Sequence, residues 1–493
     1  MAKLAKLDDI VSLCKRRGFI FQSSEIYGGL ASCYDYGPLG AELKRNVRNA
    51  WWKAVVQMRD DVVGLDCSIL MHPMVWKASG HADKFADLVT VCKKCNTRSR
   101  VDHLQDKSDG GSDQEHTEHI NIEIEAGKPH DLSRKVCPAC GAVGQFSQPM
   151  AFKLMFETQM GANVDDQMTL FLRPETAQGI FVNFRNVLDS TRVKVPFGIG
   201  QIGKSFRNEV TTKAFIFRTR EFEQAELEFF CKPGTDEQWY DHWKQQRFSW
   251  YLNLGIKKEN LRFREHEKDE LAHYAKACVD IEYKFPFGQG DWQELEGIAN
   301  RTDYDLRQHQ RGMRTMNDWF EQKGDLTKIT LKEEDPDYVK GPLSYFDEET
   351  RERYVPYVIE PSAGIDRSTL AFLVDAYDED EVNGEPRSLL RFHPHLAPIK
   401  AAVFPLVKKD GMPEIARKLY DDLKGSFACF YDEKGAVGRR YRRQDEAGTP
   451  FCLTVDGQTK EDNTVTIRER DSMVQIRVSL DQVKACLHDK LNL

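Results

Sequence analysis

The chain has 493 residues, enough for about two to four domains. Hydrophobic residues make up 40% and charged residues 30% of it, as in ordinary globular proteins, and no apolar run reaches the ~18 residues of a membrane span. A formal net charge of −8 excludes a globally basic surface, so a polyanionic partner would have to bind a local basic patch.

The N-terminus shows no export signal. Residues 1–19 mix acidic and basic side chains without an apolar core or a small-residue cleavage site. The 12 cysteines include two CxxC pairs and are otherwise scattered, which favours reduced thiols and one metal site over a disulfide framework. We therefore expect a cytoplasmic protein.

The first elements expected are helices and short strands. Apolar residues at helical spacing predict an amphipathic helix over residues 4–17 and a longer one over about 40–58. A strand is expected over residues 60–70. The adjacent Trp51 and Trp52 are equally consistent with a place in the core and with a subunit interface.

Two cysteine pairs follow, Cys92 with Cys95 and Cys137 with Cys140. Two such turns supply four thiolates in tetrahedral reach, the arrangement that structural zinc prefers. Because four sulfurs leave no open coordination position, the expected zinc is structural and not catalytic. The alternative is a pair of turns with redox-labile thiols.

The segment between the two pairs, residues 102–133, is rich in acidic residues, glycine and histidine. We expect a solvated insertion here. Its histidines are also potential metal ligands: His103, His116, His119 and His130.

After residue 150 the pattern returns to strands. A strand is expected over residues 152–156, and a second strand runs from residue 169 into a helix over 176–188. Arg173 and Glu175 lie at that junction on either side of a proline. An acid and a base at the end of a strand suit ligand contacts, while capping of the helix by Glu175 is an equally physical interpretation.

Residues 203–231 carry the most informative pattern, an antiparallel hairpin with a tip at residues 211–213. Alternation in the second arm places Arg220, Phe222, Gln224 and Glu226 on one face and Glu221, Glu223, Ala225 and Leu227 on the other. Buried carboxylates need partners or ligands. The hairpin is therefore either a ligand-binding element or an exposed structure held by ion pairs.

The following region is expected to be helical over 236–275, extended over 277–285 and extended again around Glu294, with a polar insertion over 308–353. Next, a strand, a glycine turn and an apolar helix opening near Ile365 place Arg367 beside free backbone N–H groups. This combination suits a phosphate, although the chain has no Walker motif.

From residue 396 the pattern changes to a small α/β domain of about 100 residues, with a helix over 412–424 and a strand over 428–431. The densest basic cluster of the chain, residues 438–443, lies in this domain. Tyr441 stands among its four arginines, a mixture that favours nucleic acid contact by phosphate pairing and base stacking.

Long strings along the chain resemble class II aminoacyl-tRNA synthetases and, within them, the dimeric glycyl-tRNA synthetases. FRNE at residues 206–209 and FRTREFEQAE at 217–226 are similar to the second signature motif of the class, and GIDR at 364–367 to the third. GPLGAELKRNVRNAWW is similar to the helix of the first motif, and the strings RPETAQGIF, ELEGIANRTDYDL, EPSAGIDR and GRRYRRQDEAGTPFCLTVD are similar to glycyl enzymes.

The resemblance implies an α/β multidomain fold. A class II catalytic domain with an antiparallel β-sheet core flanked by helices would span residues 1–395, with a zinc-knuckle insertion at 90–150 and another at about 305–353. Residues 396–493 would form an α/β anticodon-binding domain.

For ATP, the resemblance implies that Arg207 holds the α-phosphate, Glu209 the adenine amino group and Phe222 the adenine ring. Arg218 and Arg367 would clamp the outer phosphates. Glu294 would be the carboxylate on the magnesium side of ATP. The implied ATP-binding set is Arg207, Asn208, Glu209, Phe217, Arg218, Thr219, Arg220, Glu221, Phe222, Glu294, Leu295, Gly364, Ile365, Asp366 and Arg367.

For glycine, the resemblance implies a pocket of carboxylates for the α-ammonium group. A substrate without a side chain is selected by filling the space that a Cβ would need. The implied set is Arg100, Glu175, Phe222, Glu223, Gln224, Ala225, Glu226, Glu360, Pro361, Ser362, Ala363 and Gly364.

The implied activity is that of a glycine–tRNA ligase. ATP would activate glycine to glycyl-adenylate, and the glycyl group would pass to the 3′ end of tRNA(Gly), with release of pyrophosphate and AMP. Arg207 and Arg367 are the implied catalytic residues, with Mg²⁺ and a structural Zn²⁺ as cofactors and a homodimer as the assembly.

Three alternatives explain less of the sequence. A class II enzyme for alanine or serine lacks the glycyl-type strings around the pocket. A noncatalytic RNA binder would be expected to have lost arginines of the ATP clamp, yet Arg207, Arg218 and Arg367 are all present. A zinc-stabilised assembly module accounts for the cysteine pairs alone.

Overall fold

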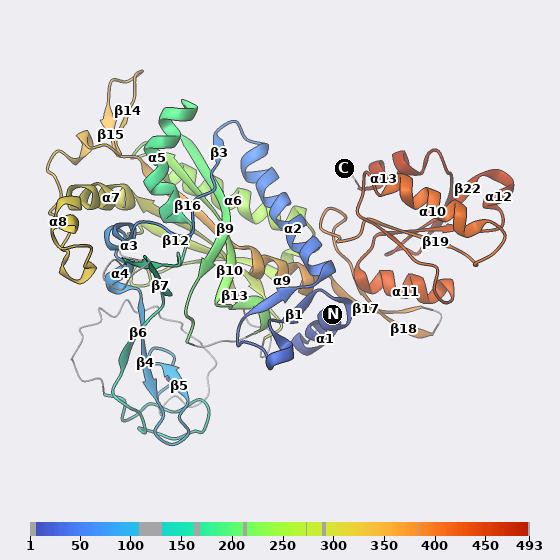
Figure 1. The fold of residues 1–493 in the computed structure, drawn as a ribbon, viewed down its shortest axis with the longest axis horizontal. Coiled ribbons are helices and arrows are strands. Elements are labelled where there is room, and N and C mark those ends of the chain that lie inside the picture. The colour runs from blue at the N-terminus through green and yellow to red at the C-terminus, as the bar shows by residue number, and fades with distance from the viewer. Residues whose placement is uncertain are drawn as a thin grey trace.

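The computed structural model describes residues 6–107, 131–161, 168–210, 214–272, 274–287, 292–382 and 384–491. Figure 1 shows three parts: a large body built on a central sheet, a small projection that carries β4, β5 and β6, and a C-terminal body drawn in orange and red. The tip of the hairpin at residues 211–213 and most of the predicted acidic insertion lie outside the described residues.

A seven-stranded sheet forms the centre of the large body, in the order β11-β12-β13-β16-β10-β9-β3. Every neighbouring pair is antiparallel except β3 with β9. The predicted hairpin is confirmed as β9 and β10. The strands are β3 (Val62–Gly64), β9 (Phe197–Phe206), β10 (Glu221–Cys231), β11 (Leu261–Glu265), β12 (Ala277–Lys284), β13 (Trp292–Thr302) and β16 (Tyr357–Gly364).

Helices cover both faces of the sheet. The helices α2 (Pro38–Trp52), α6 (Asp236–Asn253) and α9 (Ile365–Ala376) pack in one core with Ala225, Leu227 and Phe229 of β10. On the other face, α5 (Ala177–Thr191) and α7 (Tyr304–Arg314) contribute to a second core. The alternation predicted for β10 is thus confirmed, with its odd-numbered residues under α2, α6 and α9.

The predicted long helix is α2, which continues as a π-helical turn over Lys53–Gln57. Proline in the first turn suits the start of this helix. Glycine is required at position 40, because a Cβ there would lie 1.8 Å from Phe19 O. Trp51 is 1% exposed, and Trp52 packs on the same core and against Gly64. Both tryptophans therefore have partners within the chain.

Buried charges join the helices to β10. Lys44 of α2 lies 3.0 Å from Glu223 Oε2 and donates to Asp366 Oδ1 at 2.7 Å, and Tyr36 donates to the same Asp366 oxygen at 2.6 Å. Asp366 in turn accepts from the backbone N–H of Glu223 at 2.7 Å. Because Glu223 and Glu226 are 7% and 2% exposed, the alternative of an exposed, ion-paired hairpin is wrong.

Two predicted elements differ from the structure. The strand expected over 60–70 is limited to β3. The helix expected over 236–275 ends at Asn253, and a 3-10 turn (Lys258–Asn260) leads into β11. Gly255 adopts φ +97°, which breaks the helix, and the alternating sequence LRFRE then forms the edge strand.

The polar segment after β13 is partly integrated into the large body. Its first helix, α7, packs against α3 (Pro73–Ala78) and α5, and it is followed by α8 (Met316–Glu321) and the short pair β14 (Tyr345–Phe346) and β15 (Arg353–Tyr354). Asp305 and His309 of α7 are buried. The start of the predicted insertion thus belongs to the main core.

The projection contains a three-stranded antiparallel sheet in the order β5-β4-β6. Its strands are β4 (Ala86–Val91), β5 (Arg98–Arg100) and β6 (Met150–Lys153). A small core of its own surrounds Cys92 and Cys137. It is followed by the hairpin of β7 (Glu157–Met160) and β8 (Met168–Phe171), which returns the chain to the large body.

The C-terminal body is a five-stranded mixed sheet in the order β20-β19-β21-β22-β23. Its own hydrophobic core extends from Ala401 to Leu491. The elements are β19 (Ala401–Pro405), α10 (Met412–Leu423), β20 (Cys429–Tyr431), α11 (Val437–Ala447), β21 (Phe451–Val455), α12 (Thr459–Asp462), β22 (Thr464–Glu469), β23 (Gln475–Ser479) and α13 (Val483–Leu491).

The remaining elements flank these bodies. The described part of the first predicted helix is α1 (Leu7–Arg17), whose Arg16 and Arg17 pair with Glu446 of α11. The others are β1 (Ile20–Gln22), β2 (Tyr34–Tyr36), α4 (His81–Lys84), β17 (Tyr377–Val382) and β18 (Glu385–Leu390).

Asp445 of α11 is fully buried between two arginines. Arg387 of β18 donates to it at 3.1 Å, and Arg468 of β22 makes two bonds of 2.9 and 3.0 Å. The three side chains are 0%, 2% and 6% exposed. Asp445 thereby joins the β17–β18 hairpin to the C-terminal body.

We predict that Asp445→Ala destabilises this body by about 3–5 kcal/mol, because it leaves the buried Arg468 without a carboxylate and Arg387 with Asp380 alone. Amide hydrogen exchange of β19, β21 and β22 should accelerate by about 10²-fold or more. Glu414→Gln, at an exposed position of α10, is the matched control. Unchanged exchange in Asp445→Ala would contradict a structural role for this cluster.

Candidate active site

The site is built on β10, β16 and β13, on the face opposite α2, α6 and α9. Glu226 of β10 is paired in register with Ser362 of β16, and Ala299 of β13 is paired with Glu360 of β16. The antiparallel register therefore brings Glu226, Glu360 and Ser362 side by side. The turn that leads into α5 lies next to them and supplies Glu175 and the N-cap residue Thr176.

Arg301 of β13 is the buried cation of this cluster. Its Nη1 donates to both oxygens of Glu360 at 3.0 and 2.8 Å, while Nε and Nη2 donate to Asp305 of α7 at 2.8 and 2.9 Å. The side chain is 4% exposed. One guanidinium is thus shared by two buried carboxylates.

Glu226 is held by hydrogen bonds from neutral groups. Its Oε2 accepts from the Thr176 N–H at 2.9 Å and from the Thr176 hydroxyl, and its Oε1 accepts from Gln224 at 2.9 Å and from Ser362 at 2.7 Å. These donors fix the orientation of the carboxylate. They bring no full positive charge to it.

Glu175 stands at the edge of the same cluster. His81 Nε2 lies 3.4 Å from its Oε2, and Gln178 donates to its Oε1 at 2.9 Å. Gln178 also donates to Asp305 at 3.1 Å and lies 2.8 Å from His309 Nε2. Of the two interpretations of Glu175 left open by the sequence, a place in the carboxylate cluster is the one the geometry favours.

The carboxyl groups of the cluster differ in acidity. Burial raises the pKa of Glu360 to about 7, with Arg301 opposing the rise and Glu226 and Glu175 adding to it. Burial and Glu175 likewise raise the pKa of Glu226. Burial also acts on Glu175, but His81 and Arg301 outweigh it and hold the pKa of Glu175 well below its ordinary value. A cation entering this cluster would be stabilised.

A second group of charges lies along the same face. Arg207 donates to Pro174 O at 3.1 Å, and its guanidinium lies 5.4 Å from the ring centre of Phe222 and 5.7 Å from that of Phe85. Arg367 lies 4.4 Å from the ring centre of Phe217 and 3.2 Å from Glu294 Oε2. Aromatic rings beside arginines in this way suit a planar, phosphorylated ligand.

Arg218 and Arg100 complete this group. Burial lowers the pKa of Arg218, and the charge of Glu209 opposes this shift. The charges of Arg367 and Arg100 lower the pKa of Arg218 further, so these side chains lie near one another. Arg100 of β5 is oriented by Asp87 at 3.2 Å and by Asp102 at 2.6 Å. The projection thus reaches the site through Arg100.

Several predicted residues do not join the open face. The side chain of Glu223 is paired with Lys44, Asp366 is paired with Lys44 and Tyr36, and Ala225, Leu295 and Ile365 lie in the core under the helices. In strands, alternate residues point away, so a ligand on the open face could meet Glu223 and Ala225 only through their backbone.

Other predicted positions have structural partners. Arg220 donates to Ala31 O, Glu221 pairs with Lys204, and the Thr219 hydroxyl donates to Glu221 O. Asn208 donates its backbone N–H to Leu154 O, while Pro361, Ala363 and Gly364 belong to β16. Arg173, expected beside Glu175, instead binds the carbonyls of Lys204 and Cys67 and is 2% exposed.

The sequence patterns missed the inner partners of the cluster. Arg301, Asp305, Gln178 and His81 were not predicted. The available signal was that Gln178 lies in the string RPETAQGIF and that Arg301 and Asp305 lie in ELEGIANRTDYDL, both similar to glycyl enzymes.

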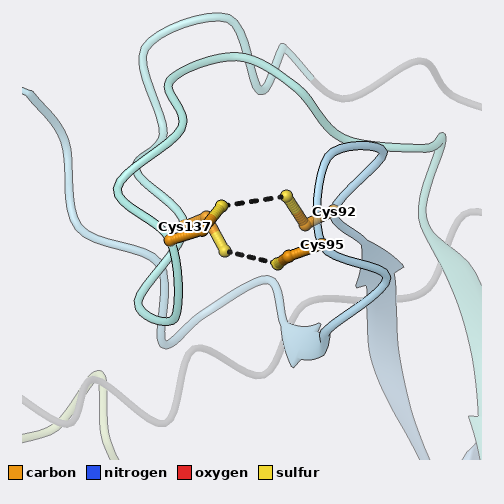
Figure 2. Close-up of side chains that lie close together, drawn as sticks. Cys92, Cys95 and Cys137 are labelled. Carbon is orange, nitrogen blue, oxygen red and sulfur yellow. Dashed lines mark hydrogen bonds between the residues drawn. The ribbon is translucent and has the colours of Figure 1, made fainter.

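The four predicted cysteines come together in the projection. Cys92 Sγ lies 3.7 Å from Cys140 Sγ and Cys95 Sγ lies 3.6 Å from Cys137 Sγ. Figure 2 shows Cys92 and Cys95 pointing toward Cys137 on the facing loop. Tetrahedral zinc with Zn–S bonds of about 2.3 Å separates its sulfurs by about 3.8 Å. The four thiols therefore fit a structural zinc ion.

The basic helix α11 differs from its prediction. Arg440 is 2% exposed and donates to the carbonyls of Pro405 and Leu406. The Tyr441 hydroxyl lies 2.6 Å from Thr454 Oγ1, and its ring packs edge-on against Phe404. Tyr441 is half-buried in this packing, with Arg468 4.9 Å from its ring centre, and base stacking on it stays a prediction. Arg439 remains exposed on this helix.

No helix in the parts of the chain that the structure describes combines the length and apolar character of a membrane span.

The chain is similar to known proteins over nearly its whole length. Residues 156–377 match the family model described as "tRNA synthetase class II core domain (G, H, P, S and T)", and residues 400–490 match "Anticodon binding domain". A solved prolyl-tRNA synthetase from Cryptosporidium parvum has the same fold, with a TM-score of 0.60 and 12% identity over 100% of this chain and 78% of that one.

Relatives named "Glycine--tRNA ligase" are far closer in sequence. The proteins from Thermobifida fusca and Caldanaerobacter subterraneus subsp. tengcongensis are 50% and 52% identical, over 99% and 98% of both chains. That from Treponema denticola is 49% identical over 96% of this chain and 94% of its own. The resemblance predicted from the sequence is confirmed, and the chain belongs to the glycine–tRNA ligase family of class II aminoacyl-tRNA synthetases.

Proposed function

We propose that this chain activates glycine with ATP and transfers the glycyl group to tRNA(Gly), using the carboxylate cluster for glycine and the neighbouring arginines for ATP. The observation that carries this assignment is the juxtaposition of the two groups on one face of the sheet. A pocket that favours a cation lies beside a pocket that favours phosphate groups. This arrangement matches an amino acid bound next to a nucleotide.

The α-ammonium group of glycine would enter among Glu175, Glu226 and Glu360. Glu226 is held by neutral donors, and Arg301 is already shared between Glu360 and Asp305. An ammonium group with three N–H donors would supply the positive charge that these carboxylates lack. Ser362 would help to orient it.

ATP would lie beyond this pocket. The adenine ring would stack on Phe222, and Arg207, already oriented by Pro174 O, would meet the α-phosphate. Arg218 and Arg367 would hold the outer phosphates. Glu294 is 52% exposed at its side chain and offers oxygen ligands, which suits Mg²⁺ bound to phosphates. When bound, Mg²⁺ would neutralise phosphate charge.

The first step would then need positioning and electrostatics alone. The glycine carboxylate attacks the α-phosphorus in line, a P–O bond forms, and pyrophosphate leaves with the electrons of the broken bond. Arg207 stabilises the charge that builds on the α-phosphate oxygens. In the second step a 3′-terminal hydroxyl of tRNA attacks the carbonyl carbon of the adenylate, and AMP leaves.

Membership of the family supports our proposals for the partners and the location. The C-terminal body would bind the anticodon arm, and exposed arginines such as Arg439 offer it phosphate contacts with a salt-dependent affinity. We further propose a cytoplasmic homodimer. The loop between β1 and β2 supports an assembly, because Ile26 and Tyr27 are 87% exposed and Leu30 is 57% exposed.

The first test is exchange of pyrophosphate into ATP with glycine, alanine or serine. We expect exchange with glycine alone, and a loss of about 10²-fold or more in Arg367→Ala, because one charge that stabilises the transition state is removed. Arg185→Ala, which removes an exposed ion pair with Asp189 on α5, serves as the control. Folded protein that shows no exchange with any of the three would sink the proposed function.

A second test uses the pKa of Glu360, which burial raises to about 7 against the opposing charge of Arg301. Above this pH the carboxylate is charged and favours the ammonium group. As the pH falls through 7 it is protonated, so KM for glycine should rise, by up to about tenfold per pH unit. The charged groups around it include Arg301, Glu226, Glu228 and Glu175, and burial raises the pKa of Glu226 and of Glu228 as well.

The control for this test is Glu360→Gln, which removes the titrating group while keeping its shape. We expect a raised KM for glycine whose dependence on pH between 6 and 8 is flatter than that of the wild type. An equally steep dependence in the variant would assign the effect to a different group of the cluster.

A third test concerns the structural zinc. The double variant Cys137→Ser/Cys140→Ser should lose one zinc ion per chain and the fold of the projection, because the metal holds its two loops together. Zinc content and limited proteolysis between β4 and β6 measure the two effects. Retention of zinc with a protected projection would show that the metal is not held by these thiols.

A further inference from the structure

Three metal-binding side chains meet at the β11–β12 edge of the central sheet. His266, Cys278 and Asp280 each offer a ligand atom, and these atoms all lie within 4.8 Å of one another. His266 Nε2 is 2.8 Å from Asp280 Oδ2. We propose that this group, here called the edge triad, is a second metal site that takes a divalent ion of the zinc class.

The backbone holds the edge triad in place. His266 follows β11 directly, and its N–H donates to Cys278 O at 3.0 Å, which extends the β11–β12 pairing by one residue. Cys278 and Asp280 are two residues apart on β12, so both project from the same face. Two ligands thus lie on β12, and the third directly follows β11 with its backbone bonded to β12.

The three ligand atoms, all within 4.8 Å of one another, are near enough to reach one ion. Tetrahedral zinc, with bonds of about 2.0–2.2 Å to nitrogen and oxygen and 2.3 Å to sulfur, separates its nitrogen and oxygen ligands by about 3.4 Å and sulfur from either by about 3.6 Å. The His266 to Asp280 distance would widen by about half an ångström. The proton now shared between them would leave.

The ligand chemistry selects the ion. A thiolate, an imidazole and a carboxylate together favour zinc over magnesium or calcium, which prefer oxygen alone. Three protein ligands leave a fourth position open. This differs from the four-cysteine site of the projection, which closes the coordination of its ion.

The surroundings are negative enough for a cation. Arg264 Nη1 lies 3.9 Å from Asp280 but is engaged by Glu270, so one guanidinium serves two carboxylates. Asp280 is 8% exposed, and Cys278 and His266 are half-buried. An ion could therefore enter from solvent and still be shielded.

The edge triad shares a face with the glycine pocket. Val279 and Ile281 of β12 point into the core under the helices, so Cys278 and Asp280 point to the opposite, open face. In register, Asp280 faces Gly297, and Gly297 faces Ser362. Two strand spacings, about 10 Å, therefore separate the proposed ion from the pocket.

Zinc stoichiometry of the full chain tests the proposal. In buffered Zn²⁺ the wild type should bind two ions per chain, and Cys278→Ala and His266→Ala should each bind one. Cys33→Ala, a half-buried cysteine elsewhere, should still bind two. The double variant Cys137→Ser/Cys140→Ser should keep one, which separates this site from that of the projection.

Alkylation gives a second measurement that needs no variant at the triad. In the Cys137→Ser/Cys140→Ser background, Zn²⁺ should slow alkylation of Cys278 by iodoacetamide by at least about tenfold, because a coordinated thiolate is not free to react. Alkylation of Cys33 should not change. Equal zinc content in wild type, Cys278→Ala and His266→Ala, or no protection of Cys278, would overturn the proposal.

Discussion

The arrangement of this protein depends on how β10 keeps its buried carboxylates compensated. Burial of an unpaired charge is costly, and this strand buries Glu223 on one face of the sheet and Glu226 and Glu228 on the other. Under the helices, Glu223 meets Lys44, which also holds Asp366 at the start of α9. On that face the charges are paired within the protein, and these ion pairs fix α2 and α9 against the sheet.

On the open face, the buried carboxylates are compensated differently. Arg301 is divided between Glu360 and Asp305, whereas Glu226 and Glu175 depend on hydrogen bonds and on His81. The raised pKa of Glu360 and of Glu226, both caused first by burial, expresses this shortage of positive charge. A pocket that is incomplete without a cation suits an amino group better than a pocket already paired within the protein.

Basic residues in the C-terminal body show the reverse case. Arg440 belongs in the sequence to the basic cluster at residues 438–443, yet it binds backbone carbonyls, and Arg468 of β22 binds Asp445. Arginine can serve either purpose because its planar group donates five hydrogen bonds. Only the packing of α11 against β19 and β21 separates the structural arginines from exposed ones such as Arg439.

Local features of the sequence were enough to predict the family, the hairpin with its two faces, the cysteine cluster and the helix that opens at Ile365, because motif strings, period-two alternation and CxxC spacing are local properties. The sequence placed Glu175, Glu226 and Glu360 in one pocket only through resemblance. Only the folded chain shows that Arg301 and His81 are their partners, that Asp305 shares Arg301 with Glu360, that Glu223 and Asp366 face away, and that His266 joins Cys278 and Asp280. These pairings join residues far apart in sequence or on different strands, and their contact depends on sheet register and burial, which no local pattern encodes.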